Sequence, residues 1–273
     1  GLNFRTTFGI DNLTTINRSF QNPVHGDGVA NGGNASNTSQ SYRRWNLTNV
    51  LSYNKSFGSH NISALAGNEQ QYTAQEGWGA TRQGVTDPFF NEFQGGYNII
   101  VPAGNFLSEN YLVSFFGRVN YDYKKKYLLS VNARRDGYSA FSPENKYGTF
   151  WGASAGWVIS QEKFFQNAGL DKIFSNFKLR ASYGIVGNNQ GINDFAFWSF
   201  FGSGLYGTNP SLAFSQAGNR DLRWETSKKT DIGLELGLLD GRMNIEATYF
   251  MNDVNNLISV SYTHLTLPTN REV

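Results

Sequence analysis

Residues 111–133, YLVSFFGRVNYDYKKKYLLSVNA, decide the fold. On each side of Lys124–Lys126, apolar and polar side chains alternate with a period of two, which predicts two β-strands joined by a tight turn. One face of this hairpin carries Tyr111, Val113, Phe115, Val119, Tyr121, Tyr123, Tyr127, Leu129, Val131 and Ala133. The other face carries Ser114, Arg118, Asn120, Asp122, Ser130, Asn132, Arg134 and Asp136. The hairpin is therefore apolar on one side and polar on the other.

The same alternation recurs along most of the chain and predicts nine strands. They cover residues 2–11, 41–57, 61–80, 109–123, 127–137, 147–160, 177–187, 221–239 and 242–258. The connections are long at 12–40, 81–108 and 188–220 but short at 58–60, 124–126 and 240–241. Long connections at one end and short turns at the other are typical of an outer-membrane barrel. The connection 161–176 is the exception on the short side, and its apolar residues predict a small amphipathic helical turn.

Composition narrows the class of protein. The 273 residues include 30 Gly and no Cys, and 23 Lys+Arg against 21 Asp+Glu give a net charge of +2. The lack of Cys excludes a disulfide scaffold, thiolate metal sites and thiol catalysis. The near-zero net charge argues against a nucleic-acid partner, which requires a clustered basic face. No apolar run approaches the roughly 18 to 20 residues of a transmembrane helix, whereas a barrel crosses a bilayer on alternating strands of about 10 residues.

The apolar faces have the chemistry of a lipid-facing surface, because Tyr and Trp near strand ends suit the membrane–water interface. We expect an outward-facing set of Trp151, Ala153, Ala155, Trp157, Leu179, Tyr183, Ile232 and Leu234. We expect an inward-facing set of Ser154, Arg180, Ser182 and Glu235. The alternative is that the aromatic residues fill the core of a soluble β-sandwich. The predicted strands of 14 to 20 residues argue against it, because soluble sheets use strands of about 5 or 6 residues.

Mixed charges on the polar faces are candidate lumen-facing residues. They are Arg118, Asp122, Arg134, Asp136, Lys178 and Arg180. They would line a passage, anchor an internal plug or pair across strands. Cross-strand pairing is the default for mixed charges at this spacing.

The connection 188–220 carries candidate residues for contact with a substrate or partner. They are Phe195, Phe197, Trp198, Phe200 and Tyr206. Exposed rings could stack on sugar rings or close over a ligand, and the alternative is that they pack on one another to hold a long loop in shape. The connection 12–40 is nearly devoid of aromatic residues and is expected to be the more mobile of the two.

No catalytic constellation is recognisable in the sequence. Before the C-terminal tail the chain contains only His25 and His60, and neither stands at triad spacing to a Ser and an acid. His25 with Asp27 is too small a set for a metal site. We therefore expect no enzyme activity, no cofactor and no metal.

Several longer stretches carry a family resemblance. They are residues 51–67, 117–165, 178–189 and 219–235. The stretch GRVNYDYKKKYLLSVNARRDGYSAFSPENKYGTFWGASAGWVISQEKFF resembles the barrel signature of the SusC/RagA family of TonB-linked outer-membrane transporters. The resemblance implies an all-β antiparallel meander that forms part of a 22-stranded transmembrane barrel with an internal plug.

The same resemblance implies a function and partners. It implies active import of oligosaccharides, or in some members peptides, across the outer membrane of a Gram-negative, Bacteroidetes-like bacterium. The partners it implies are outer-membrane lipid, a SusD-like surface lipoprotein and the TonB complex, which a missing N-terminal region would contact. Two alternatives remain open, a soluble carbohydrate-binding or adhesive β-domain and a passive porin.

The expected domain organisation is a partial barrel over residues 1–259 and a non-native tail over residues 260–273. The tail VSYTHLTLPTNREV resembles translated sequencing-adapter read-through, so His264 carries no functional weight. Nine strands cannot close a barrel of the implied size. We therefore expect a curved open sheet with free edges at residues 2–11 and 243–258.

Overall fold

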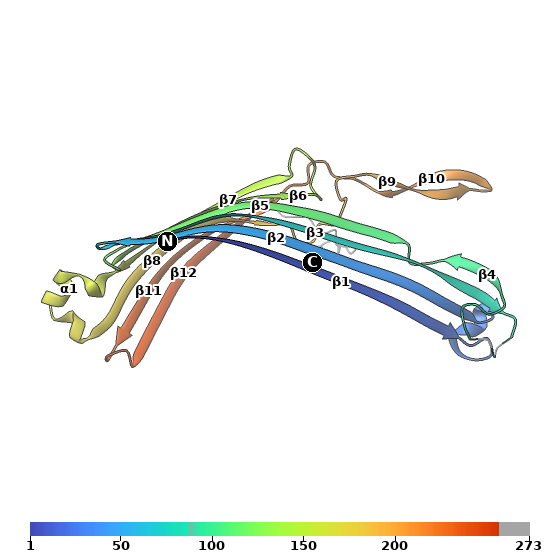
Figure 1. Cartoon of the computed structure of the whole chain (residues 1–273), viewed down its shortest axis with the longest axis horizontal. Helices are drawn as coiled ribbons and strands as arrows, with labels where there is room; N and C mark the ends of the chain where they lie inside the picture. The colour runs from blue at the N-terminus through green and yellow to red at the C-terminus, as the bar shows by residue number, and fades with distance from the viewer. Residues whose placement is uncertain (88, 90, 257–273) are drawn as a thin grey trace, which may run out of the picture.

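The computed structural model describes residues 1–87, 89 and 91–256. One large antiparallel sheet dominates it, accompanied by a separate hairpin and short helical segments (Figure 1). The strands are β1 (Leu2–Gln21), β2 (Asn34–Phe57), β3 (His60–Val85), β4 (Tyr97–Pro102), β5 (Phe106–Tyr123), β6 (Tyr127–Tyr138), β7 (Tyr147–Val158), β8 (Phe174–Asn188), β9 (Phe200–Tyr206), β10 (Asn209–Gln216), β11 (Glu225–Leu238) and β12 (Met243–Asn255). The helical segments are η1 (Gly26–Asn31), η2 (Ile159–Gln161), α1 (Lys163–Asn167) and η3 (Leu170–Lys172). The predicted all-β class is confirmed.

Nine strands form the path of the large sheet, in the order β1-β2-β3-β5-β6-β7-β8-β11-β12, and β4 pairs with β3 beside this path. Within the described residues β1 pairs only with β2, and β12 pairs only with β11. The sheet is curved and open (Figure 1). The predicted meander of nine strands with free edges is therefore confirmed over the described part of the chain.

The strand register separates two chemically different faces. Ala155 pairs with Ala181, which pairs in turn with Ile232, while the neighbouring Ser154 pairs with Ser182. Paired residues share a face, and consecutive residues point to opposite faces. The same register places Trp151, Ala153, Trp157, Leu179, Tyr183 and Leu234 with Ala155, and Arg180 and Glu235 with Ser154. The predicted separation of the two sets is confirmed.

The polar face is the concave one. A hollow of about 750 Å³ touches residues from β2 to β11 at once. One hollow can contact strands so far apart only where the sheet curves around it. Polar residues are among those that line it: Asn54, Ser56, Asn61, Ser63, Asn120, Asp122, Ser130, Ser154, Lys178, Arg180, Ser182 and Asp231. We call this side of the sheet the concave face and the apolar side the convex face.

The two ends of the sheet differ as the connection lengths predict. Tight turns join β2 to β3, β5 to β6 and β11 to β12 at one end, where α1 also lies (Figure 1). Lys124, Lys125 and Asp240 adopt the left-handed conformation that such turns require, with φ of 54°, 56° and 55°. The buried Phe165 anchors α1, which confirms the predicted amphipathic helical turn. Among the described residues no helix is long and apolar enough to cross a membrane.

The predicted loop at residues 12–40 is wrong. β1 and β2 pair without interruption from Leu2 opposite Tyr53 to Gln21 opposite Asn34, so the connection covers only residues 22–33 and contains η1. Asn, Ser and Thr occupy both faces of these strand ends, and they give no alternation from which a strand could be predicted. Backbone pairing holds β2 to a strand on each side and needs no apolar face. Over residues 12–40 the structure therefore contains paired strand ends and a short connection instead of the expected mobile loop.

The other two long connections are also shorter than predicted. Residues 81–108 include the end of β3, the whole of β4 and the start of β5. Residues 188–220 include the hairpin β9–β10, and β11 begins at Glu225 rather than at residue 221. The long end of the sheet is therefore built largely of paired backbone.

A small aromatic core closes the end of the sheet opposite the tight turns. We call this end the long-loop end and the other the short-turn end. Phe141, Phe150 and Trp224 are its buried members, and the ring centroids of Phe141 and Trp224 lie 5.0 Å apart. The indole Nε1 of Trp224 donates to the carbonyl of Lys146 at 3.1 Å. Because Trp224 immediately precedes β11, this core ties the β6–β7 connection to the start of β11.

Candidate functional site

All six charged residues predicted to face the lumen lie on the concave face. The register pairs Ser114 with Asp136 and Asn120 with Ser130, which places the charges of β5 and β6 on the side of Ser154. The same side holds the charges of β8 and β11, because Lys178 pairs with Glu235. The structure gathers the six residues into one curved surface but divides them among three different local settings.

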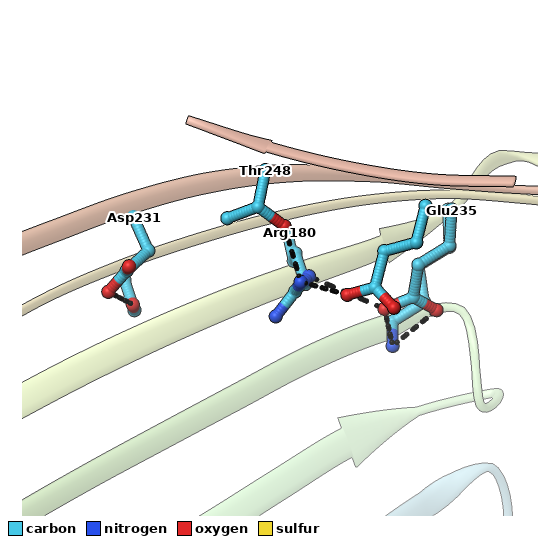
Figure 2. A network of polar contacts seen from close by, with 7 residues as sticks. Arg180, Asp231, Glu235 and Thr248 are labelled. Carbon is cyan, nitrogen blue, oxygen red and sulfur yellow. Dashed lines mark hydrogen bonds and ion pairs between the residues drawn. The ribbon is translucent and has the colours of Figure 1, made fainter. Parts of the chain in front are cut away.

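The first setting is an ion-pair network centred on Arg180 (Figure 2). Glu235 Oε1 lies 3.2 Å from the Nζ of Lys178 and 3.5 Å from the Nε of Arg180. A terminal nitrogen of Arg180 donates to Thr248 Oγ1 at 2.8 Å and also pairs with Glu246. The network therefore joins three strands, β8, β11 and β12.

Gly233 explains how Arg180 reaches the third strand. Arg180 lies directly opposite Gly233, which lies opposite Thr248. A Cβ at Gly233 would stand 2.4 Å from the Nε of Arg180 and 3.0 Å from its Cζ. The missing side chain leaves a gap in β11 across which the guanidinium passes to β12. Ser182 and Asp231 pair nearby with an Oγ–Oδ2 distance of 3.2 Å (Figure 2).

The second setting is a compact cluster around Arg134. Its guanidinium pairs with Asp136 at 2.6 Å and with Glu69 at 3.1 Å, and it donates to the buried Ser114 Oγ at 2.7 Å. The ring of Phe116 supports it from one side, with the guanidinium carbon 5.6 Å from the ring centroid. The guanidinium of Arg134 is therefore bound by side chains of the sheet itself.

The third setting holds Asp122 and Arg118, which the structure does not bring into an ion pair. Asp122 Oδ1 accepts from the side-chain amide of Asn61 at 2.9 Å and from the backbone N–H of Lys125 at 3.2 Å. It therefore caps the tight turn. Arg118 has no ion-pair partner among the residues that the structure describes.

The aromatic candidates of the connection 188–220 separate into two groups. The rings of Phe197 and Trp198 lie 4.8 Å apart, and those of Phe195 and Phe200 meet edge to face at 6.3 Å. Tyr206 lies apart from them at the tip of β9–β10 and is 83% exposed. The four residues of the first group pack together, and three of them, Phe195, Phe197 and Trp198, also line hollows, so the geometry is compatible with both sequence-based interpretations.

Asp194 anchors the first aromatic group to the sheet. Its carboxylate accepts from the side-chain amide of Asn110 at 3.0 Å and also from the hydroxyl of Ser108. Both donors belong to β5. A hollow of about 290 Å³ forms where the loop meets the sheet, lined by Tyr72, Glu109, Asn110, Tyr111, Ser139, Phe195, Phe197 and Trp198.

Sequence reasoning missed the partners that complete these clusters. Glu246 and Thr248 could have been found by continuing the alternation through the Asp240-Gly241 turn, because the register then places Glu246 opposite Glu235. Glu69 and Asp194 left no comparable signal, since each reaches its partners from a remote part of the chain.

One titratable group at the short-turn end is perturbed. Glu162 lies between η2 and α1 and accepts from Trp157 Nε1 at 3.2 Å and from Lys126 Nζ at 3.4 Å. A hydrogen bond from Tyr127, followed by those from Trp157 and Lys126, lowers the pKa of Glu162 from its usual value. The described residues contain no group of three or more His, Cys, Asp or Glu that could hold a metal ion.

Comparisons with known proteins add to this geometry. The family model described as "TonB dependent receptor-like, beta-barrel" matches residues 1–271. "TonB-dependent receptor P3" of Formosa agariphila is 34% identical over 264 residues, which cover 94% of this chain and 26% of that protein. "TonB-dependent receptor SusC" of Bacteroides thetaiotaomicron is 31% identical over 210 residues, which cover 71% of this chain and 19% of that protein. The chain therefore spans about a quarter of these curated relatives or less.

Solved structures show the same fold. The chain matches "Structure of the RagAB peptide transporter" with a TM-score of 0.79 and 23% identity, over 93% of this chain and 28% of that one. The ferric-catecholate import receptor Fiu of E. coli matches with a TM-score of 0.53 and 16% identity, over 93% of this chain and 38% of that one. The curved sheet is thus arranged like a segment of these barrel walls.

Proposed function

The chain belongs to the TonB-dependent receptor β-barrel family, and from that premise we propose that it forms part of the wall of an outer-membrane importer. The observation that carries this proposal is the segregation of faces by the register, apolar on the convex side and polar on the concave side. A barrel wall between lipid and water requires this arrangement. A soluble sandwich would instead bury its apolar face against a second sheet.

The convex face supports contact with lipid. Large apolar side chains on it are exposed, among them Val119, Val131, Trp151, Leu179 and Ile232. At the short-turn end, stacked rings run across strand ends from Tyr123 to Tyr127 and on to Trp157, with centroids 6.3 and 6.5 Å apart. Such a row suits the headgroup level of a bilayer. Relatives from Formosa and Bacteroides support the outer membrane of a Bacteroidetes-like bacterium as the location.

The concave face is proposed to line the lumen of a 22-stranded barrel around a plug. Arg118, Asp122, Arg134, Asp136, Lys178 and Arg180 are the proposed lumen-facing charges. Arg118, without an ion-pair partner in the described structure, has a charge left to contact a plug or a passing substrate, whereas the two cations of the Arg180 network are paired with two carboxylates. The tightly paired Arg134 cluster has a structural part, since its bonds are satisfied within the wall.

The long-loop end is proposed to face outside and to meet a SusD-like surface lipoprotein. The hairpin β9–β10 exposes Phe201, Leu205, Tyr206, Leu212 and Phe214, an apolar surface that a partner could cover. The substrate is proposed to be an oligosaccharide or a peptide. TonB would act on a plug region outside this chain, and no covalent reaction on the substrate is proposed.

Adjacent cysteines test the proposal, with the unsubstituted full-length protein as the background control, because residues 1–273 themselves contain no Cys. Ser154→Cys and Ala155→Cys, each in the full-length protein in outer-membrane vesicles, differ by one residue and by face. A water-soluble maleimide should modify only Ser154→Cys, and a lipid-dissolved quencher should reach only a label at Ala155→Cys. Protection of Ala155→Cys from both the maleimide and the lipid-dissolved quencher would favour the soluble β-domain. Uptake that persists in cells without TonB would favour a passive porin.

A further inference from the structure

A hollow of about 500 Å³ lies at the long-loop end, away from the charge clusters of the concave face. One wall is the turn at residues 142–144 between β6 and β7. The other wall comes from residues 197–199 and 218–220, which flank the hairpin β9–β10. The volume is within the range of about 300–1,000 Å³ that small-molecule sites occupy.

Ser142 gives this hollow an unsatisfied polar group. The residue is 4% exposed and lines the hollow, and its Oγ has no hydrogen-bond partner among the described residues. A buried hydroxyl without a partner is costly, so such a group in a native structure calls for a specific explanation. A ligand hydroxyl or carbonyl seated in the hollow would supply the missing partner once the Ser142 side chain turns its Oγ toward the hollow.

The remaining lining is half apolar and half polar. Trp198 is 54% exposed and lies against Phe197 with the two rings tilted by 38°, which leaves part of its indole free. Glu144 and Arg220 also line the hollow, and neither forms an ion pair within the described part of the chain. The site thus combines two aromatic residues with two serine hydroxyls, a carboxylate and a guanidinium.

Hydrogen bonds hold the two walls in place. The side-chain amide of Asn145 donates to the carbonyl of Arg220 at 3.4 Å and joins one wall to the other. The side-chain amide of Gln216 donates to the carbonyls of Phe195 and Trp198 at 3.2 and 3.0 Å. A hollow whose walls are fixed in this way is preformed, which lowers the ordering cost of binding.

We propose that this hollow binds one saccharide unit of the imported substrate, an inference that rests on the proposed importer function. A pyranose ring has an apolar face that can lie on Trp198 and a rim of hydroxyls for Ser142, Glu144 and Arg220. Ionised donors and acceptors make the stronger hydrogen bonds to such hydroxyls. A peptide is favoured less, because the lining residues come from turns and offer no strand edge on which a peptide backbone could add.

Binding by the full-length protein in detergent tests the inference. Calorimetry would use neutral oligosaccharides of four to seven glucose, mannose or galactose units, and peptides of matched length. We expect at least one oligosaccharide to bind, Trp198→Ala to weaken its binding at least tenfold, and Ser142→Ala to weaken it three- to tenfold. Trp78→Ala, an exposed tryptophan of β3 that does not line the hollow, is the matched control and should change binding less than twofold.

The melting temperature separates a binding role of Ser142 from a structural one. Ser142→Ala removes only an unpartnered hydroxyl, and the turn itself rests on the backbone bond from Asn145 N–H to the carbonyl of Ser142. The melting temperature should therefore stay the same or rise while binding weakens. A fall in melting temperature with unchanged binding would overturn the inference.

The remaining outcomes distinguish this inference from the importer function. Binding of peptides alone, binding of neither panel, or saccharide binding unaffected by both substitutions would overturn the saccharide site. TonB-dependent uptake would still stand in each of those cases. Loss of TonB dependence with a working saccharide site would instead overturn the importer function.

Discussion

At the scale of single residues, Gly233 matters because of the atoms it lacks. Gly233→Ala places a Cβ where the Arg180 side chain crosses β11, so the guanidinium must leave Glu246 and Thr248. We expect a loss of about 1–2 kcal/mol in unfolding free energy, mostly from overpacking, because the ion pairs are partly solvent-screened. Denaturant unfolding of the full-length protein in detergent measures it.

Gly117→Ala is the matched control for that substitution. A Cβ there would meet its nearest neighbour, the carbonyl oxygen of Leu65, at 3.4 Å, which is an ordinary contact. Its unfolding free energy should change by less than about 0.5 kcal/mol. Equal effects of the two substitutions would show that the path of Arg180 across Gly233 is not what makes the glycine necessary.

Glu162 is the residue at which pH should act. Its folded pKa lies below the usual value of about 4.5, so the stabilisation it provides is present above that value and is lost as the pH falls through the folded pKa. We expect the fluorescence of Trp157, whose indole donates to Glu162, to change as the pH falls below about 4.5. Glu162→Gln should remove this change, and a transition that persists in the variant would assign it to another group.

At the scale of elements, the convex and concave faces should differ in their tolerance of charge. Ala155→Arg on β7 places a cation on the convex face and should cost about 2–4 kcal/mol if residue 155 lies near the bilayer midplane. Ser154→Arg faces the hollow and should cost far less. The yield of heat-modifiable barrel in the outer membrane measures both. Equal yields would place residue 155 outside the lipid belt.

A strand could be predicted from the sequence where its two faces differ in polarity. β5–β8 and β11 were found because each has one apolar and one polar face, and a one-residue slip would expose the wrong set. The far ends of β1 and β2 were missed because Asn, Ser and Thr on both faces give no alternation. Only the backbone pairing, from Leu2 opposite Tyr53 to Gln21 opposite Asn34, defines those ends.

The candidate site also contains residues that the sequence could place and partners that it could not. The alternation of apolar and polar residues along each strand was enough to place Arg118, Arg134 and Arg180 on one face. Glu69 could not be predicted as a partner, because it reaches Arg134 from a remote strand, whereas Glu246 follows from continuing the alternation through the Asp240-Gly241 turn. Ser142 was missed for a related reason, since its unpaired hydroxyl is visible only once the turn and the Trp198 loop are placed together.

At the scale of the whole molecule, the sheet is open at both edges within the described residues. β1 and β12 each leave one backbone edge unpaired within the described residues. Unpaired backbone groups are costly in lipid, so the family's closed barrel is the arrangement that satisfies them. The wall is then a common framework, and the elements that can differ in partner and substrate are those at the long-loop end.

The hairpin β9–β10 is the element at that end most suited to a partner. Replacing residues 201–214 by Asn-Gly in the full-length protein removes the exposed Phe201, Leu205, Tyr206, Leu212 and Phe214 and leaves a loop long enough to close the hairpin base. It leaves Phe200 and Gln216, which pair at the base of the hairpin, and so keeps the bonds from Gln216 to Phe195 and Trp198. We therefore expect normal barrel assembly and intact ligand hollows but at least tenfold weaker association with the lipoprotein, measured by co-purification from outer membranes.

Phe201→Ser with Phe214→Ser is a milder variant that removes the ring pair and should weaken association in the same direction. Unchanged association in both variants would show that these side chains only hold the hairpin together and that the partner docks elsewhere.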